Sequence, residues 1–485
     1  MAEPVIYDIS KPGRSGVSLP EPDVPSAEPP VELTREDLNL PELSELDVVR
    51  HFVRLSQKNH SIDTGFYPLG SCTMKYNPKV NEDAARLPGL VLTHPLQPEE
   101  TAQGNLALMY ELGHWLEEIG GFAGVSLQPA AGAHGELTGI LMIQAYHRDR
   151  GDGKRTKILV PDSAHGTNPA TTTMSGLEVV EIPSDDRGNV DIEALRNECD
   201  ETVAGLMLTN PSTLGLFDEN VVEVIELVHG CGGLVYGDGA NMNAILGVIR
   251  PGDLGFDVLH YNLHKTFSTP HGGGGPGSGP VGVAQTLLDY LPGPIVAKTE
   301  IEGETRYELA IPKKTIGRVK AFNGHFGMMV RAYTYMRMNG KEGLRAIADH
   351  AVLNANYLRV KLRDTYRVPY DRMCMHEFVA EGRFDDVKDI HALDISKRLI
   401  DFGLHPPTNY FPLIVKEALM IEPTETESKE TLDYFVEVMK RIAREARENP
   451  KILQSAPSET ELGRMDEVRA ARELVLRSRA LNGGK

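Results

Sequence analysis

One lysine, Lys265, precedes a stretch of glycines that a regular helix or strand would not tolerate. It lies in the run 262–267, and six of the eight residues from Gly272 to Gly279 are glycine. Glycine weakens helices and strands because it loses the most backbone freedom on folding. The sequence therefore predicts that Lys265 stands on an irregular loop. Such a lysine attacks carbonyl carbons once burial or a neighbouring cation removes its proton, although a surface lysine before a flexible loop would show the same pattern.

An aspartate 27 residues earlier, Asp238, favours the chemical interpretation. It follows the apolar run 233–236, which predicts a short buried strand with the carboxylate at its end. A carboxylate beside a pyridine nitrogen keeps the ring protonated, and the protonated ring stabilises a carbanion. An Asp-Gly turn without chemistry is common. A loop lysine and a strand-end aspartate together favour pyridoxal 5'-phosphate (PLP), with Lys265 as its Schiff-base partner.

Small residues from Gln128 to Gly135 predict where the phosphate of that cofactor would lie. They lead into an apolar-periodic segment, and backbone N–H groups at the start of a helix bind anions. Tight packing explains small residues there nearly as well. A polar loop after the expected strand 158–160 contains His165, whose imidazole would stack on a cofactor ring or bond a substrate. A histidine that caps a nearby carbonyl is the alternative.

Helical and strand-like segments alternate between about residues 103 and 285. We expect helices near 103–119, 135–149, 190–199 and 219–230, and strands near 158–161, 178–182, 205–209, 233–237, 257–262 and 280–284. This alternation predicts βαβ units and a largely parallel sheet. Ligands bind beyond the carboxyl ends of such strands. One edge of the sheet would therefore carry His165, Asn210, Asp238 and Lys265.

The segments on either side of this α/β region have a different composition. Five prolines between positions 20 and 30 predict an extended arm, whose bounds we set at 1–60 and which would contact a partner. A large PLP-binding domain over 61–330 would precede a smaller C-terminal α/β domain over 331–450. The smaller domain would consist of helices over 324–339 and 343–360, strands near 374–380 and 411–415, and a helix over 429–448. Residues 451–485 would form a charged tail, with a solvated helix over 459–478.

Charge and cysteine content narrow the range of partners. The chain has 50 basic and 69 acidic residues and a net charge of −19, so we expect neither nucleic acid nor an anionic membrane as a partner. Its four cysteines form no CxxC pair and no metal-ligand spacing, which predicts no metal site and fits a reduced cytoplasmic protein. The sequence has no secretory pattern at its start and no apolar stretch of about 18 residues.

Several long motifs resemble the P-protein of the glycine cleavage system, a PLP-dependent glycine dehydrogenase that decarboxylates its substrate. They are the runs 68–75, 163–170, 238–244 and 262–279, and the similarity extends from about residue 40 to the 440s. The single-chain P-protein has two similar halves, and this chain resembles the separately encoded second subunit. The resemblance implies the fold-type-I PLP-dependent transferase fold, with a mostly parallel seven-stranded sheet. It also implies a first subunit as partner, in a complex with two copies of each chain.

The resemblance further implies a reaction and a set of site residues. Glycine would lose CO2, and its aminomethyl group would pass to the lipoyl arm of the H-protein. Matched motif by motif, Lys265 would bond the PLP aldehyde, His165 would stack on the ring as a second catalytic residue, and Asp238 would pair with the pyridine nitrogen. The other expected cofactor contacts are Ala240, His264, Gly132, Ala133 and His134.

The residues alone leave two alternatives open. Another fold-type-I PLP enzyme, such as an amino acid decarboxylase or an aminotransferase, would use the same cofactor residues, and only the resemblance selects glycine. A non-catalytic supporting subunit would have no reason to keep Lys265, Asp238 and His165 together. Candidates for contact with the glycine carboxylate are Arg318, Arg331 and Arg337, although arginines more often cap helices or form ion pairs.

Overall fold

The computed structural model describes residues 3–35, 38–271, 275 and 277–476 of the chain. Within them, seven strands form the main sheet, in the order β1-β7-β6-β5-β4-β2-β3. Strands β3, β2, β4, β5 and β6 are parallel, whereas β7 is antiparallel to both β6 and β1. The bounds are β1 Gly124–Ser126, β2 Lys157–Pro161, β3 Glu178–Ile182, β4 Val203–Thr209, β5 Leu234–Gly239, β6 Val258–Tyr261 and β7 Val281–Val283. The mostly parallel seven-stranded sheet expected from the sequence is thus confirmed.

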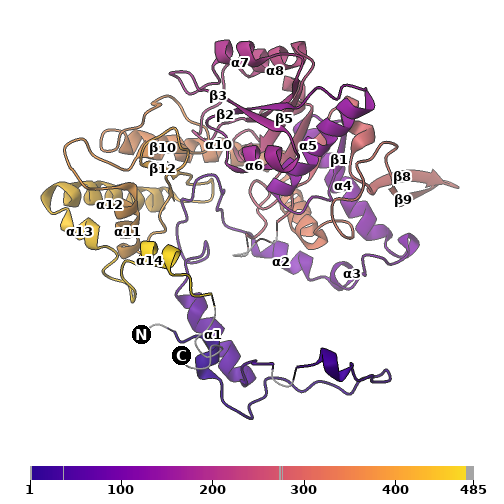
Figure 1. Cartoon of the computed structure of the whole chain (residues 1–485), viewed down its shortest axis with the longest axis horizontal. Helices are drawn as coiled ribbons and strands as arrows, with labels where there is room; N and C mark the ends of the chain where they lie inside the picture. Colours follow the sequence, from indigo (N-terminus) through magenta and orange to yellow (C-terminus); the bar gives the residue numbers. More distant parts are fainter. Residues whose placement is uncertain (1–2, 36–37, 272–274, 276, 477–485) are drawn as a thin grey trace.

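Helices cover both faces of this sheet (Figure 1). Leu206 and Leu208 of β4 pack into one core with helices α4 (Gln103–Gly120) and α8 (Val221–Gly230). Met207, between them, packs into another core with α5 (Gly132–Asp149). Successive side chains of a strand point to opposite faces, so a strand covered on both sides is apolar throughout. All seven residues of β4 are accordingly buried.

The helices and strands expected between residues 103 and 285 are present, with ends that differ by a few residues. The prediction missed β1 and the helix α6 (Thr167–Met174), whose TNPATTTM sequence has no apolar stripe. It also missed the hairpin of β8 (Ile295–Ile301) and β9 (Glu304–Ala310), which projects from the body (Figure 1). Shorter helices are α2 Lys79–Ala85, α3 Pro88–Val91, α7 Ile192–Glu198 and α9 Pro251–Leu254.

Helix α10 (Phe326–Leu362) connects the main sheet to the C-terminal part of the chain. Gly340 interrupts it with a φ of 63° and a ψ of −178°, between the two helices expected there. Apolar residues of α10 up to Ala348 belong to the core of the main sheet, and those from Ala355 on belong to a second core. Both halves of the molecule therefore share this helix, and the domain boundary expected after residue 330 stays a prediction.

The second core lies beneath a small antiparallel sheet of β10 (Phe378–Glu381), β12 (Ala418–Ile421) and β11 (Thr408–Asn409). Helices α11 (Ala392–Asp401), α12 (Lys429–Glu448) and α13 (Lys451–Ser455) pack around it (Figure 1). The expected helix over 429–448 is confirmed. The strand expected near 411–415 is wrong, because that segment is the loop between β11 and β12. Pro412 has no N–H to donate to a ladder.

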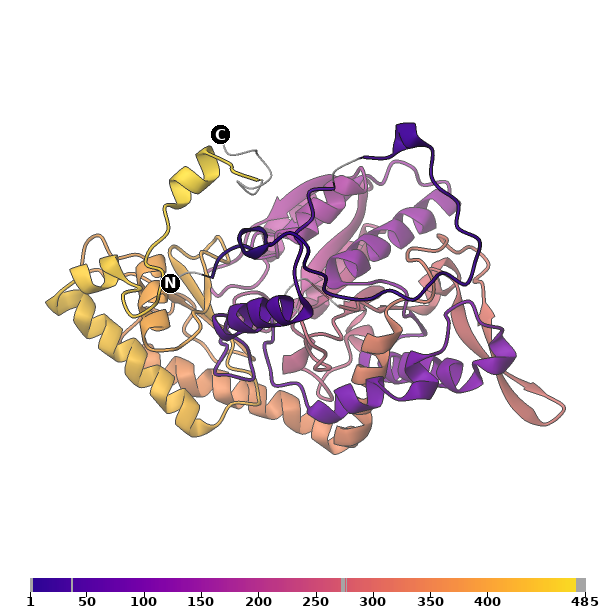
Figure 2. The same cartoon turned by 90° about the horizontal axis from the view of Figure 1, so that it is seen from below.

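The N-terminal segment is extended only in part. Up to Pro41 the described residues form no helix or strand beyond the single 3-10 turns Ile6–Ile9 and Val31–Leu33, and they run as a long loop outside the main sheet (Figure 2). The extended form expected over 1–60 is wrong for α1 (Glu45–Gln57). There the Ser44 hydroxyl accepts from the Asp47 N–H, and the Asp47 carboxylate accepts from the Ser44 N–H, a capping box that fixes the helix start.

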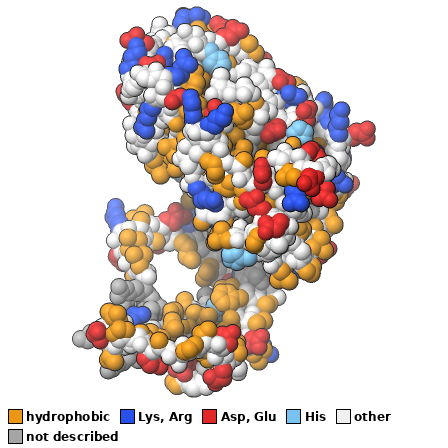
Figure 3. Space-filling view, turned by 90° about the vertical axis from the view of Figure 1, so that its right-hand side faces the viewer, with side chains coloured by type: hydrophobic (Ala, Val, Ile, Leu, Met, Phe, Trp, Pro, Cys, Tyr) orange, Lys and Arg blue, Asp and Glu red, His pale blue; other side chains and the backbone are white. Residues whose placement is uncertain are grey.

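Apolar side chains are exposed on this N-terminal segment. They gather on the lower lobe in Figure 3, and on α1 they are Leu46, Val49, Phe52, Val53 and Leu55. At the other end of the chain, the helix expected over 459–478 is present only as α14 (Glu467–Arg472), and residues 477 and 478 lie outside the described part. None of the described helices has an apolar stretch long enough to cross a membrane.

Candidate active site

A cavity of about 160 Å³ lies where the carboxyl ends of β2, β4, β5 and β6 meet the start of α5. The structure brings to its wall seven of the eight residues expected at the site, namely Gly132, Ala133, His165, Asp238, Ala240, His264 and Lys265. The eighth, His134, does not line the cavity. Its Nδ1 accepts a hydrogen bond from the Ala130 N–H at 3.1 Å, so its side chain is used to hold the turn before α5.

Lys265 stands in a turn that follows β6. Its N–H donates to the Asn262 carbonyl at 3.0 Å, and its own carbonyl accepts from the Ser268 N–H at 3.2 Å. Among the residues that the structure describes, no carboxylate forms an ion pair with its ammonium group. The lysine is held by its backbone while its side chain stays free at the cavity. Of the glycine-rich stretch expected after it, residues 272–274 and 276 lie outside the described part.

Asp238, near the end of β5, is buried beside the cavity with 4% of its surface exposed. Its Oδ1 accepts from the Ala240 N–H at 2.9 Å, and its Oδ2 accepts from the Asn168 side-chain amide at 3.2 Å. Burial by itself raises the pKa of Asp238, but the charges of His260 and Lys265 and these hydrogen bonds outweigh it and lower the pKa below its usual value. The carboxylate is therefore ionised at neutral pH.

The contribution of His260 to that shift is smaller than its position suggests. Its Nε2 lies 3.6 Å from Asp238 Oδ1, but burial lowers the pKa of His260, so the ring is neutral near pH 7. The same Nε2 faces the Asn262 side-chain amide at 2.6 Å and accepts its N–H. We therefore attribute the ionisation of Asp238 mainly to Lys265 and to the hydrogen bonds from Ala240 and Asn168.

A second carboxyl group, Glu136, also lines the cavity, although it was not among the residues expected there. It accepts from the Thr167 hydroxyl at 2.7 Å and from the Asn168 amide at 3.0 Å. The Asn168 amide thus bridges Glu136 and Asp238. Burial, together with the charge of Asp238, raises the pKa of Glu136 to about 7. Near neutral pH Glu136 is therefore partly protonated, whereas Asp238 keeps its negative charge.

The two expected histidines lie at different depths in the site. His165 is exposed, with its Nδ1 2.8 Å from the Thr167 hydroxyl and its ring edge-on to Phe411 at 5.4 Å. His264 is more buried and accepts from the Ser278 N–H at 3.4 Å, and burial lowers its pKa to about 3. Both positions agree with uncharged rings that contact a ligand, but stacking of His165 on a cofactor stays a prediction.

The start of α5 can hold an anion because close packing leaves only backbone there. A Cβ on Gly132 would lie 2.5 Å from Asn262 Oδ1, and one on Gly279 would lie 2.1 Å from the Ala131 carbonyl oxygen. The first N–H groups of a helix have no partner within it, and Gly132 and Ala133, at the start of α5, line the cavity. Thr209, at the end of β4, lines it too, and its hydroxyl has no partner among the described residues.

Some expected residues lie elsewhere. Asn210 follows β4 as predicted, but it lines a different cavity and its Oδ1 accepts from the Asp218 N–H at 3.0 Å. Arg331 is held by Glu82 at 2.7 Å, and Arg318 donates to the Phe322 carbonyl. None of Arg318, Arg331 and Arg337 lines the cavity.

The cavity wall also contains residues that sequence reasoning missed, namely Ser71, Glu136, Thr167, Thr209, Thr213, Asn241, His260 and Asn262. Five of them had a usable signal. Four lie in the runs 68–75, 163–170, 238–244 and 262–279, namely Ser71, Thr167, Asn241 and Asn262, and Glu136 directly follows the small-residue turn expected at the phosphate.

Comparisons with known proteins agree with this geometry. Residues 347–460 match the family model described as "Glycine dehydrogenase, C-terminal domain". The chain is 58% identical over 481 residues to the probable glycine dehydrogenase (decarboxylating) subunit 2 of Caldanaerobacter subterraneus subsp. tengcongensis, and the match covers 98% of each chain. The protein of the same name from Alkaliphilus oremlandii is 56% identical over 478 residues, again with 98% of each chain covered.

Solved structures share the fold at lower identity. The inhibitor-bound glycine decarboxylase (P-protein) of the glycine cleavage system superposes with a TM-score of 0.73 at 22% identity, over 85% of this chain and 93% of that one. Glutamate decarboxylase from Lactobacillus brevis gives a TM-score of 0.64 at 13% identity, over 87% and 96%. These likenesses establish the fold-type-I architecture. With 56–58% identity to its relatives over nearly its whole length, the chain belongs to the family of glycine dehydrogenase (decarboxylating) subunit 2 proteins.

Proposed function

We propose that this chain is the PLP-binding subunit of a glycine dehydrogenase that removes CO2 from glycine and passes the aminomethyl group to the lipoyl arm of an H-protein. The observation that carries the proposal is the meeting of Lys265, Asp238 and His165 at one cavity. The relatives named for glycine favour that substrate over other amino acids, since the likeness to glutamate decarboxylase extends only to the fold.

The residues at the cavity fit PLP group by group. The N–H groups of Gly132 and Ala133 suit the phosphate, with His264 beside them, and Lys265 offers an unpaired amine to the aldehyde. Asp238 is a buried carboxylate that suits the pyridine nitrogen, while Ala240 fixes one of its oxygens. When bound, PLP supplies a protonated ring that takes up the electron pair left on the glycine α-carbon as CO2 departs.

The protein's own residues set the charge and the order of the site. Asp238, which stays ionised, would hold a proton on the ring nitrogen, and the raised pKa of Glu136 limits a second negative charge beside it. The ring of His165, which lines the cavity, would cover the face of the cofactor ring. The Thr209 hydroxyl, which has no partner among the described residues, would be available to a ligand.

We also propose that a first subunit completes the enzyme, in a complex with two copies of each chain that works in the cytoplasm. Support comes from the apolar side chains that α1 exposes, Leu46, Val49, Phe52, Val53 and Leu55, since large exposed apolar surfaces mark protein interfaces. The lipoyl arm of the H-protein would reach the cavity from its open side. Thiols suit a reducing compartment, and all four cysteines are free.

An absorbance spectrum tests the proposal. The complex purified with PLP should show a band near the visible edge that borohydride removes, together with glycine-dependent exchange of CO2. Lys265→Ala should fold but lose both, because no other amine of the described residues lines the cavity. Lys313→Ala, which changes an exposed lysine elsewhere, should keep both. Normal exchange in Lys265→Ala would show that the site is wrong.

A further inference from the structure

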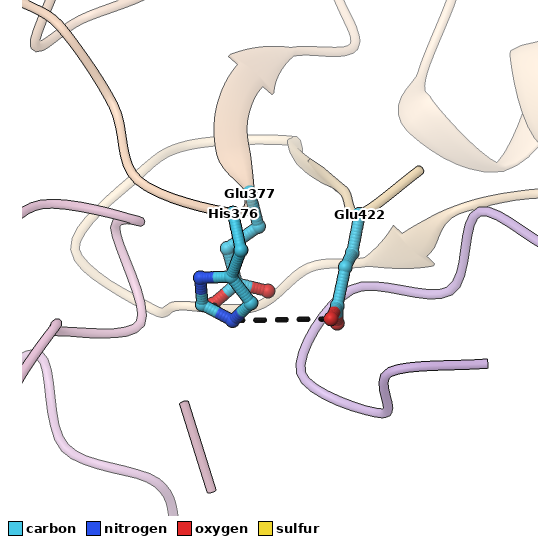
Figure 4. A group of neighbouring side chains, drawn as sticks. All are labelled: His376, Glu377 and Glu422. Carbon is cyan, nitrogen blue, oxygen red and sulfur yellow. Dashed lines mark ion pairs between the residues drawn. The ribbon is translucent and has the colours of Figure 1, made fainter. Parts of the chain in front are cut away.

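Three buried side chains form a cluster that the glycine reaction does not use. His376 and Glu377 directly precede β10, and Glu422 follows β12, so the small antiparallel sheet brings them together (Figure 4). All three side chains are fully buried. His376 Nε2 lies 3.8 Å from Glu377 Oε1 and 3.9 Å from Glu422 Oε1, and one ligand atom from each residue lies within 4.8 Å of the other two.

Part of this cluster has no partner in the protein. Among the described residues, neither ring nitrogen of His376 makes a hydrogen bond, and neither does Glu422 Oε1. A buried polar atom without a partner costs about 1–3 kcal/mol. Two of these atoms, His376 Nε2 and Glu422 Oε1, lie 3.9 Å apart, so they indicate a ligand between them. Figure 4 shows the imidazole and the Glu422 carboxylate facing each other across this space.

Backbone N–H groups hold both carboxylates in this orientation. The Ser71 N–H donates to Glu377 Oε2 at 2.7 Å, and the Thr73 N–H donates to Glu422 Oε2 at 2.9 Å. Each carboxylate is thus oriented through its Oε2. The Oε1 of Glu422 is left to face the histidine, while the Oε1 of Glu377 also accepts from the Asn241 amide at 3.3 Å. Contacts that orient ligand atoms in this way are a regular feature of metal sites.

We propose that His376, Glu377 and Glu422 bind a divalent transition-metal cation, Zn²⁺ or Mn²⁺. A point at the centre of the three ligand atoms lies roughly 2–2.5 Å from each of them, near the 2.0–2.2 Å of Zn²⁺ bonds to nitrogen and oxygen. A mixed imidazole and carboxylate set suits these ions, whereas Mg²⁺ and Ca²⁺ prefer oxygen alone. Among the described residues, Lys265 forms no ion pair with the cluster, and its charge interacts with Glu377 and Glu422 only over a longer distance. No protein cation therefore occupies the space between the ligand atoms.

The charge of the cluster agrees with this assignment. The carboxyl groups of Glu377 and Glu422 are both fully buried, and buried carboxylates need a cation beside them to stay charged. A bound divalent ion would supply that positive charge.

The proposed ion would sit behind the wall of the PLP cavity. Glu377 accepts from the Ser71 N–H and from the Asn241 side-chain amide at 3.3 Å, and Ser71 and Asn241 both line that cavity. The ion would therefore anchor the small sheet to two residues of the active site. It would act on the structure of this wall and would not touch the substrate.

Equilibrium dialysis of the purified complex tests the proposal without relying on activity. After chelator treatment, the wild-type complex should take up about one Zn²⁺ or Mn²⁺ per copy of this chain, its melting temperature should rise with the ion concentration, and Mg²⁺ and Ca²⁺ should have little effect. His376→Gln and Glu422→Gln should lose both the uptake and the shift. His391→Gln, in which the ion pair of an exposed histidine with Glu417 is lost, should keep both.

X-ray absorption at the zinc edge provides a second measurement, which needs no variant. Nitrogen and oxygen ligands without sulfur would support the cluster, while a sulfur shell would move the ion to a cysteine and overturn the proposal. Absence of stoichiometric uptake by the wild-type complex, or uptake that His376→Gln leaves unchanged, would overturn it too. Failure of the PLP assignment would leave these results unaffected, because ion uptake is measured without glycine.

Discussion

Replacement of Asp238 by asparagine separates the electronic role of this residue from its structural role. The amide has nearly the same shape, and its oxygen can still accept from the Ala240 N–H. Its NH2 group would face the Asn168 amide nitrogen, but Asn168 Oδ1 has no partner among the described residues. The Asn168 amide can therefore turn over and accept the new N–H. We expect Asp238→Asn to fold and to bind PLP.

What Asp238→Asn removes is the negative charge beside the ring nitrogen. A hydrogen bond to a charged group contributes about 1.5–3 kcal/mol, and about 1.4 kcal/mol corresponds to a tenfold change in rate. Because Asp238 is only 4% exposed, water cannot replace the lost charge. The rate of glycine-dependent CO2 exchange should fall roughly 10- to 150-fold, and more if the ring nitrogen loses its proton altogether.

The assay is CO2 exchange with labelled bicarbonate, alongside the PLP absorbance band and the melting temperature. Asp218→Asn is the matched control, since Asp218 is a carboxylate of similar burial that accepts from the Val190 and Asn220 N–H groups away from the cavity. It should change stability but leave the exchange rate of the folded enzyme unaltered. An Asp238→Asn enzyme with nearly wild-type turnover would refute the role of Asp238.

Three further perturbations follow from the geometry. The pKa of Glu136 is about 7 in the folded protein, against an ordinary value of 4.5. Between these two pH values the folded chain binds more protons than the unfolded chain, so its stability falls as the pH rises through this window. Glu136→Gln should flatten this fall in melting temperature, and an unchanged slope would contradict the raised pKa. Gly279→Ala would place a Cβ 2.1 Å from the Ala131 carbonyl oxygen. In melting and PLP-titration experiments it should lower stability by about 1–3 kcal/mol and weaken PLP binding. Gly153→Ala, whose Cβ would meet no atom within 4 Å, should do neither. Deletion of residues 1–35 should weaken assembly with the first subunit in size-exclusion chromatography with light scattering, and an equally stable complex would argue against a role for this segment.

The sequence determined much of the fold because its signals are local. The apolar run 203–209 and the apolar stripe of α12 show which residues of each element are buried, whichever element it packs against. Elements without such a stripe were missed, as α6 was, because their burial comes from neighbours distant in the chain. The strand expected at 411–415 failed for a related reason, since pairing with β10 selected the segment 418–421 instead.

The same division holds for the active site. Lys265, Asp238 and His165 were predictable because each lies at or soon after the carboxyl end of a strand, and the ends of parallel strands meet by topology alone. Glu136 and the cluster of His376, Glu377 and Glu422 were not, because nothing in their local sequence states which charges they will meet. Their pKa values depend on burial and on partners brought from other elements. The amino-acid sequence is enough to identify residues capable of catalysis. Only the tertiary structure brings Glu136 beside Asp238, and only it leaves His376 and Glu422 buried without hydrogen-bond partners for some of their atoms.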